Sequence, residues 1–244
     1  MYMKINVFFT PLGVDDLYFK DKTTVVIDVL RASSTIVTAL NNGAKEIIPV
    51  AGIESAIKLS GGMFGGHTLL CGERNTKKID GFALGNSPFE FTKEIVSNKT
   101  IVLYTTNGTK ALTKTKFSEN LFVGSFLNLN SLTNHLLNLN NNLEIVCAGS
   151  NNHFSIEDAL CAGFICDKIL QKNKDTVLTD SAKAAVTLKK KNNQNVLETL
   201  LDSDHGKILI ENGFDKDIEY CAQNSVIDII PYYNNGSIKI LNIL

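Results

Sequence analysis

Short apolar runs alternate with amphipathic stretches of helical length from the start of the chain to residue 171. Several of the runs, such as VVIDV (25–29) and TIVLY (100–104), are unbroken and rich in β-branched residues. Runs of this kind are typical of strands that are buried on both faces of a parallel sheet. The alternation therefore predicts an α/β fold, with three layers (α/β/α) around a mostly parallel central sheet.

The pattern also predicts where the elements lie. The expected strands are residues 5–9, 24–29, 46–50, 68–71, 100–104, 121–124, 143–148, 227–232 and 237–241. The expected helices between them are residues 33–42, 53–60, 88–97, 108–114, 129–140 and 155–171. A helical excursion then follows, with helices expected at 180–191, 195–201, 203–212 and 216–223, before a last strand pair joined by the hairpin turn Asn235-Gly236. Because no stretch has the composition of a linker, we interpret residues 1–244 as a single domain; the alternative is a separate small C-terminal subdomain.

The composition of the chain limits the kinds of molecule that it can bind. A net charge of -1 gives no general attraction to nucleic acid or to anionic membranes, so any anion binding must be local. The chain has no apolar run of membrane-spanning length, and its first residues become polar too soon for a signal peptide. The five cysteines include no CxxC pair and are typical of reduced core residues. We therefore expect a cytoplasmic protein that binds neither nucleic acid nor membrane.

Arginine is rare in this chain. Only two of the 24 basic side chains are arginines, Arg31 and Arg74, and each lies near an acidic residue, Asp28 or Glu73. The fixed fork of guanidinium donors matches phosphate or sulfonate oxygens in a way that a lysine cannot. Ordinary surface or ion-pairing arginines are the alternative. We favour an anion-binding site because both arginines follow predicted strands.

Three loops after predicted strands have the residue types of an anion site at a helix start, and two of them, RASST and TTNGT, bring small hydroxyl residues there. Backbone N–H groups and the positive end of the helix dipole favour an anion at such a position. The same residue types are also the usual helix N-caps, so capping is the alternative for each loop. The candidate anion-binding residues in these loops are Ser33, Ser34, Thr35, Asn107 and Thr109.

Four acidic residues could provide the oxygen ligands that Mg²⁺ prefers, namely Asp28, Glu73, Glu157 and Asp158. For Glu157 and Asp158, the alternative is charge that favours the first turn of a helix. The histidines lack the spacing of metal ligands. The GxxxxGK[ST] motif is absent, and the aspartyl-phosphate pattern DxDxT fails because Leu30 occupies the position of its second acid.

Five segments together resemble a known family. VVIDVLRASSTIVTALNNGA, CGERNTKKIDGFALGNSPFEF, TTNGTKAL, CAGSNNHFSIEDALCAG and DSDHGKIL are similar to successive motifs of the 2-phosphosulfolactate phosphatases, the ComB-type enzymes of coenzyme M biosynthesis. The resemblance spans residues 4–231 and implies a Mg²⁺-dependent phosphatase that converts 2-phospho-3-sulfolactate to 3-sulfolactate. It leaves the physiological substrate open, because relatives occur where coenzyme M is not expected.

The resemblance and the residue chemistry together assign roles. Asp28, Arg31, Glu157 and Asp158 are the expected catalytic residues. The metal would be held by Asp28, Glu157 and Asp158, with Glu73 as a further ligand. The phosphoryl oxygens would be bound by Arg31, Ser33, Ser34, Thr35, Asn107 and Thr109, and the second anion of the substrate by Arg74 with Asn86 nearby. Water and Asp28 are both open as the nucleophile, and we favour metal-activated water.

Three alternatives to this hypothesis are kept. The protein could be a phosphatase for another small dianionic phosphoester, a non-catalytic sensor of a small anion, or a phosphotransferase or isomerase acting on a phosphorylated hydroxy-acid. A sensor is disfavoured because a site that only binds anions gains nothing from four nearby acids. A homodimer stays open as the assembly state.

Overall fold

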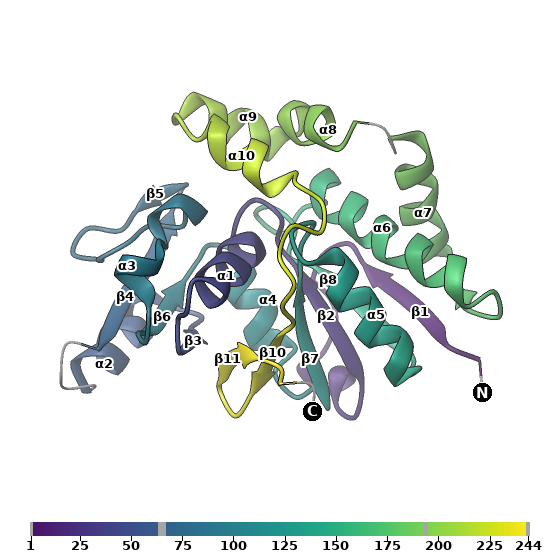
Figure 1. The fold of residues 1–244 in the computed structure, drawn as a ribbon, viewed down its shortest axis with the longest axis horizontal. Helices are drawn as coiled ribbons and strands as arrows, with labels where there is room; N and C mark the ends of the chain where they lie inside the picture. The colour runs from purple at the N-terminus through teal and green to yellow at the C-terminus, as the bar shows by residue number, and fades with distance from the viewer. Residues whose placement is uncertain (1, 63–66, 193–194, 243–244) are drawn as a thin grey trace.

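The computed structural model describes residues 2–62, 67–192 and 195–242 of the chain. Its centre is one mostly parallel sheet of 11 strands flanked by helices (Figure 1), which confirms the predicted α/β class. The strands follow the spatial order β5-β4-β6-β3-β11-β10-β7-β2-β8-β1-β9. Their bounds are Lys4–Phe8 (β1), Thr23–Ile27 (β2), Glu46–Pro49 (β3), Thr68–Arg74 (β4), Lys77–Lys78 (β5), Thr100–Tyr104 (β6), Asn120–Gly124 (β7), Leu143–Cys147 (β8), Val177–Leu178 (β9), Pro231–Asn234 (β10) and Ser237–Ile240 (β11).

The sheet consists of two parallel groups joined by an antiparallel hairpin. Strands β3, β4 and β6 are parallel to one another, and so are β1, β2, β7, β8 and β9. The hairpin β10–β11 lies between the groups, with β10 antiparallel to β7 and β11 antiparallel to β3. The predicted turn at Asn235-Gly236 is confirmed, and both residues have positive φ angles, 50° and 90°.

The helices match most of the predicted segments. They are Ala32–Asn41 (α1), Ile53–Gly62 (α2), Lys93–Val96 (α3), Gly108–Lys114 (α4), Leu129–Leu139 (α5), Ile156–Lys172 (α6), Asp180–Lys191 (α7), Val196–Asp202 (α8), Asp204–Glu211 (α9) and Asp215–Cys221 (α10). Two 3-10 helices, Asp16–Phe19 (η1) and Pro88–Glu90 (η2), complete the set. The short elements η1, β5 and β9 were not predicted, because segments of two to four residues carry no periodic signal.

Two predictions of element boundaries were wrong. The helix expected at 88–97 is divided into η2 and α3, because Thr92 has an extended backbone and acts as the N-cap of α3. The strand expected at 227–232 begins only at Pro231. The residues before it bond to a loop, since the N–H groups of Ser225 and Ile227 donate to the carbonyls of Phe126 and Leu127.

Side chains of the central strands alternate between two faces, as a sheet covered on both sides requires. On β2, Val25 and Ile27 join a core cluster with residues of α5, α6 and α7. Val26, between them, joins a different cluster that contains Ala111 and Leu112 of α4. These three side chains are buried, and so are Thr23 and Thr24, so no side chain of β2 faces solvent.

The helical excursion lies over one end of the sheet. Figure 1 shows α8, α9 and α10 grouped above the strands, away from the end where the two termini lie. Contacts from Asp217 of α10 to Arg31, just after β2, place this group at the carboxyl ends of the parallel strands. In the residues that the structure describes, no helix combines the length and apolar character needed to cross a membrane.

Candidate active site

A cavity of about 140 Å³ opens at the carboxyl ends of the parallel strands, below α9. A buried water needs roughly 10–15 Å³, so the cavity has room for a ligand of about ten non-hydrogen atoms. Its lining comes from the end of β4, from the segments that follow β2, β4, β5, β6 and β8, and from α9: Asp28, Leu30, Arg31, Glu73, Asn75, Thr76, Asn86, Thr105, Thr106, Asn107, Ser150, Asn151, His205 and Ile208. This is the position that an open α/β sheet favours for a ligand.

Asp28 is the buried acid at the base of this cavity. One carboxylate oxygen accepts a hydrogen bond from the Ala32 N–H at 3.1 Å, which places the acid at the start of α1. Burial raises the pKa of Asp28 to about 7, and the nearby carboxylates of Glu73 and Glu157 act in the same direction. Asp28 therefore shares a small buried region with two other acids, and the nearby Arg31 guanidinium offsets only part of their effect on its pKa.

Gly108 allows the TTNGT loop to approach Asp28 closely. A Cβ atom at this position would lie 2.6 Å from Oδ2 of Asp28 and 2.5 Å from Cβ of Ala32. Any larger residue would push the start of α4 away from the carboxylate. The glycine of this loop therefore has a steric role at the site.

Asp158 is held inside the protein by backbone donors. Its two oxygens accept hydrogen bonds from the N–H groups of Val29 (2.8 Å) and Gly149 (3.0 Å). Burial raises the pKa of Asp158 well above its usual range, and the carboxylates of Asp28 and Glu157 contribute in the same direction. Asp158 does not line the cavity, so its observed contacts connect the loops after β2 and β8.

Glu73 and Glu157 are the two acids near Asp28. Glu73 lines the cavity, and its two oxygens accept from the N–H groups of Thr76 (2.9 Å) and Thr106 (2.7 Å). Glu157, in the first turn of α6, lines an adjoining hollow of about 470 Å³ that shares Ser150, Asn151, His205 and Ile208 with the cavity. Both acids are buried.

The arrangement of the four predicted acidic ligands can be compared with what Mg²⁺ requires. Across the described residues, no three His, Cys, Asp or Glu side chains are arranged to bind one ion. The four predicted ligands are therefore not gathered into a single coordination shell in this conformation. Mg²⁺ needs only one or two carboxylates, with water and phosphate oxygens as its other ligands, and the oxygen-rich surroundings of Asp28 fit that requirement.

Unpartnered buried oxygens provide a second observation that points to a ligand. Among the described residues, five buried side-chain oxygens have no hydrogen-bond partner, and three of them, on Thr76, Asn86 and Thr106, belong to residues that line the cavity. A fourth, on Ser155, belongs to a residue of the adjoining hollow. Buried polar atoms are normally satisfied, so this concentration indicates a polar ligand.

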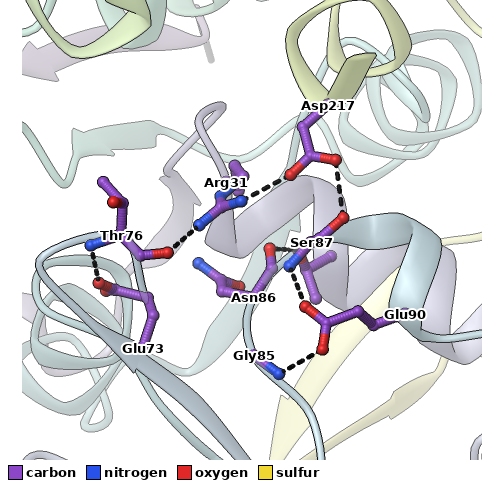
Figure 2. Close-up of polar contacts among 9 residues, drawn as sticks. Arg31, Glu73, Thr76, Gly85, Asn86, Ser87, Glu90 and Asp217 are labelled. Carbon is purple, nitrogen blue, oxygen red and sulfur yellow. Dashed lines mark hydrogen bonds and ion pairs between the residues drawn. The ribbon is translucent and has the colours of Figure 1, made fainter. Parts of the chain in front are cut away.

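Arg31 also lines the cavity. Figure 2 shows its guanidinium between Asp217 and the backbone carbonyl of Thr76, with Asn86 nearby. Nη1 lies 2.6 Å from an oxygen of Asp217, and Nη2 donates to the Thr76 carbonyl at 2.8 Å. Arg31 is the only lysine or arginine among the described lining residues, and its charge is already paired.

Comparison with known proteins places the chain in a family. Residues 9–236 match the family described as 2-phosphosulpholactate phosphatase. The chain belongs to this family. Three relatives, each named a probable 2-phosphosulfolactate phosphatase, come from Clostridium novyi, Caldanaerobacter subterraneus and Clostridium beijerinckii. The C. novyi protein is 41% identical over 95% of this chain and 97% of its own length. The C. subterraneus protein is 40% identical over 97% of this chain and 98% of its own length. The C. beijerinckii protein is 39% identical over 97% of this chain and 99% of its own length.

In this member of the 2-phosphosulpholactate phosphatase family, the predicted site residues fall into two groups. The cavity brings together Asp28, Arg31, Glu73, Asn86 and Asn107, with Glu157 in the adjoining hollow. It does not include the predicted phosphate-binding hydroxyls Ser33, Ser34, Thr35 and Thr109, or Arg74.

The predicted hydroxyls have internal partners instead. Ser33 Oγ accepts from the Asp28 N–H, and the hydroxyls of Ser34 and Thr35 donate to the carbonyls of Val29 and Asn86. Thr109 exchanges hydrogen bonds with Thr105. These four side chains brace the loops. None of them is a helix N-cap, since Arg31 and Asn107 occupy the N-cap positions of α1 and α4 without a side-chain cap bond.

Arg74 is exposed at the end of β4 and does not line the cavity. A strand of seven residues extends past the sheet edge here, where β4 pairs with β5 through Arg74 and Lys77. The sequence prediction ended this strand at Cys71 and placed Arg74 in the loop after it. In the structure the strand continues for three more residues, so Arg74 is its last residue and lies outside the cavity lining.

His205 is a site residue that sequence reasoning missed. It comes from α9 and lines both the cavity and the adjoining hollow. Burial lowers the pKa of His205, although the nearby Glu157 carboxylate acts in the opposite direction. The motif DSDHGKIL contained the signal, but the histidines were assessed only for metal-ligand spacing.

Proposed function

We propose that this protein is a Mg²⁺-dependent phosphatase that hydrolyses 2-phospho-3-sulfolactate, or a similar phosphorylated hydroxy-acid, to 3-sulfolactate and phosphate. The observation that carries the proposal is the presence of Asp28, Arg31 and unpartnered oxygens in one cavity of a chain that belongs to the 2-phosphosulpholactate phosphatase family. The relatives' names support the same substrate. The cavity and its adjoining hollow suit a small, highly charged metabolite.

The charges around the cavity support a divalent cation. Asp28, Glu73 and Glu157 lie close enough to affect one another electrostatically, while the charge of Arg31 is paired with Asp217. A phosphorylated acid would add more negative charge to this region. Asp28 and Glu157 are the candidate ligands, because both oxygens of Asp158 and of Glu73 already accept backbone hydrogen bonds. When bound, the ion would neutralise charge on the phosphoryl group.

The remaining residues would bind and orient the substrate. Arg31 presents its other N–H donors to the phosphoryl oxygens in a fixed orientation. The amide of Asn86, whose Oδ1 has no partner in the protein, would accept a hydrogen bond from a hydroxyl or a bound water. Leu30 and Ile208 provide apolar lining that limits the entry of bulk water. The reaction forms a bond from water oxygen to phosphorus and breaks the bond from phosphorus to the alcohol oxygen.

The proposal is tested by measuring phosphate release from a panel of phosphorylated hydroxy-acids that carry a carboxylate, a sulfonate or both. We expect release with Mg²⁺ or Mn²⁺, complete loss in excess chelator and recovery when the metal is restored. Full turnover in excess chelator would remove the metal from the mechanism. Tight binding of these acids without any release of phosphate would instead favour the anion sensor.

A second experiment distinguishes the two nucleophiles. If water attacks phosphorus directly, rapid acid quench during turnover followed by peptide mapping should find no phosphorylated Asp28. We expect this result because Leu30 replaces the second acid of the aspartyl-phosphate pattern. Stoichiometric phosphoaspartate would overturn direct attack by water while leaving the site unchanged.

We also propose that the protein works in the cytoplasm. All five cysteines are free and buried, which fits a reducing compartment. Expression with fluorescent tagging in the native host would test this location.

A further inference from the structure

Asp217 of α10 is not among the described residues that line the cavity, but it contacts Arg31, which is. The ion pair between them is 2.6 Å long, and the two side chains are 2% (Arg31) and 4% (Asp217) exposed. Arg31 is fixed on two further sides, because Nη2 donates to the Thr76 carbonyl and the guanidinium lies 4.1 Å from the centroid of the Phe214 ring. Phe214 and Asp217 both belong to the start of α10, so this short helix holds the arginine from the side opposite the sheet.

Asp217 is itself positioned by a rigid segment. Its second oxygen accepts a hydrogen bond from Ser87 Oγ at 2.7 Å, as Figure 2 shows. Ser87 is the N-cap of η2, where Glu90 accepts from the N–H groups of Gly85 and Ser87. Asp217 therefore joins three separate parts of the chain: the loop after β2, the segment before η2 and α10.

Arg31 shares its cavity with other acids besides its partner Asp217. Asp28 and Glu73 line the same cavity as Arg31, and Glu157 lines the adjoining hollow. Without Asp217, the nearest favourable position for the guanidinium would be against these carboxylates, where it would occupy the site of a cation. A buried ion pair need not add to the stability of the fold. Here the pair fixes the orientation of the Arg31 guanidinium.

We propose that Asp217 is a positioning residue that holds the guanidinium of Arg31 toward the phosphoryl group and away from the acids around Asp28. This inference rests on the proposed function, because it assigns the phosphoryl group to Arg31. A displacement of about 1 Å in such a group can lower a rate by roughly 100-fold.

The experiment uses Asp217→Asn, which keeps the shape of the side chain but removes its charge. The matched control is Asp215→Asn, an exposed acid in the first turn of the same helix. We expect Asp217→Asn to lower kcat/KM by about 10- to 100-fold and to weaken the binding of inorganic phosphate, with a circular dichroism spectrum like that of the wild type. Asp215→Asn should behave as the wild type does, and Asp217→Glu should recover part of the loss.

A double-mutant cycle distinguishes positioning from a structural role. If Asp217 acts through Arg31, adding Asp217→Asn to Arg31→Ala should cause no further loss of kcat/KM or phosphate affinity. Additive losses, or a folded Asp217→Asn protein with kcat/KM and phosphate affinity within about twofold of the wild type, would overturn the inference. If Asp217→Asn does not fold, Ser87→Ala takes its place in the same cycle, since it removes the other anchor of Asp217.

Failure of the proposed function would be visible separately. If the wild-type protein hydrolysed no member of the substrate panel, the function would be wrong, and the cycle would be read from phosphate affinity alone. Coupling between Arg31 and Asp217 in that affinity would still support the inference. Phosphate binding that is independent of Arg31 would overturn it.

Discussion

The two ends of the sheet each bury acidic side chains, but they treat them differently. At the amino ends, Glu144 of β8 accepts hydrogen bonds from Asn6 Nδ2 (2.9 Å) and Tyr18 Oη (3.1 Å), and the Lys22 ammonium lies 3.9 Å away. At the carboxyl ends, Asp28 has Glu73 and Glu157 as neighbours, and its pKa is raised to about 7 by burial and by these acids. Glu144 is a partnered structural acid, whereas Asp28 is held where its charge is unfavourable.

Cavity size alone does not single out the candidate site. The hollow around Glu144 measures about 630 Å³, compared with about 140 Å³ for the cavity around Asp28. None of the residues with an unpartnered buried oxygen lines the larger hollow. Among the described residues, unsatisfied polar atoms and mutually repelling acids distinguish the candidate site, because both are costly unless a ligand is bound.

The largest expected difference in activity and stability is between the variants Asp28→Asn and Glu144→Gln. Asp28→Asn should lower activity by roughly 100-fold or more without lowering the melting temperature, because it removes a candidate metal ligand and relieves repulsion. Glu144→Gln should keep activity within about twofold and cost about 1–3 kcal/mol of stability, because it weakens a satisfied network. Thermal unfolding and steady-state kinetics measure both effects.

Added Mg²⁺ sharpens the same contrast. A ligand that binds the native state raises its melting temperature, so Mg²⁺ should stabilise the wild type and Glu144→Gln but not Asp28→Asn. Equal stabilisation of all three proteins would move the metal site away from Asp28.

A smaller effect is expected from a methyl group placed beside the cavity. Gly108→Ala should cost about 1–3 kcal/mol and lower activity, because the new Cβ would lie 2.6 Å from Oδ2 of Asp28. Gly52→Ala is the control, since a Cβ there has no neighbour within 4 Å. Unfolding in urea and kcat/KM give the comparison. A Gly108→Ala enzyme as active as Gly52→Ala would show that the approach of α4 to Asp28 is unimportant.

The smallest effect is expected from Arg74→Lys. The side chain is exposed and outside the cavity. We therefore expect kcat/KM to change by less than about twofold and the free energy of unfolding by less than about 0.5 kcal/mol. Kinetics should be compared for a simple phosphomonoester and for a substrate with a second anion. A loss confined to the second substrate would return Arg74 to the role that the sequence first assigned to it.

The sequence predicted the sheet and the location of the site more accurately than it predicted individual contacts. Unbroken β-branched runs identified the buried strands, and the polar loops after them correctly placed Asp28, Glu73 and Asn107 at one edge. These features depend on short segments whose periodicity and polarity are visible directly. The single-domain interpretation and the homodimer stay predictions.

The failures concern contacts between distant parts of the chain. The same Ser and Thr residues can cap a helix or bind phosphate, and only the fold shows that Ser34 and Thr35 donate to nearby carbonyls. The partner of Arg31 lies on α10, far along the chain, so no local pattern could have identified Asp217. The antiparallel insertion of β10–β11 was hidden for the same reason.

That hairpin has a consequence for how the protein is made. Within the sheet, the two parallel groups meet only through β10 and β11, and Ile238 pairs with Ile47 from the beginning of the chain. Contacts between residues so distant in sequence form slowly. During synthesis, β3 and β7 must therefore wait with unpaired edges until residues 231–240 leave the ribosome, and unpaired strand edges invite association with other chains. The nascent protein has most need of a chaperone in this interval.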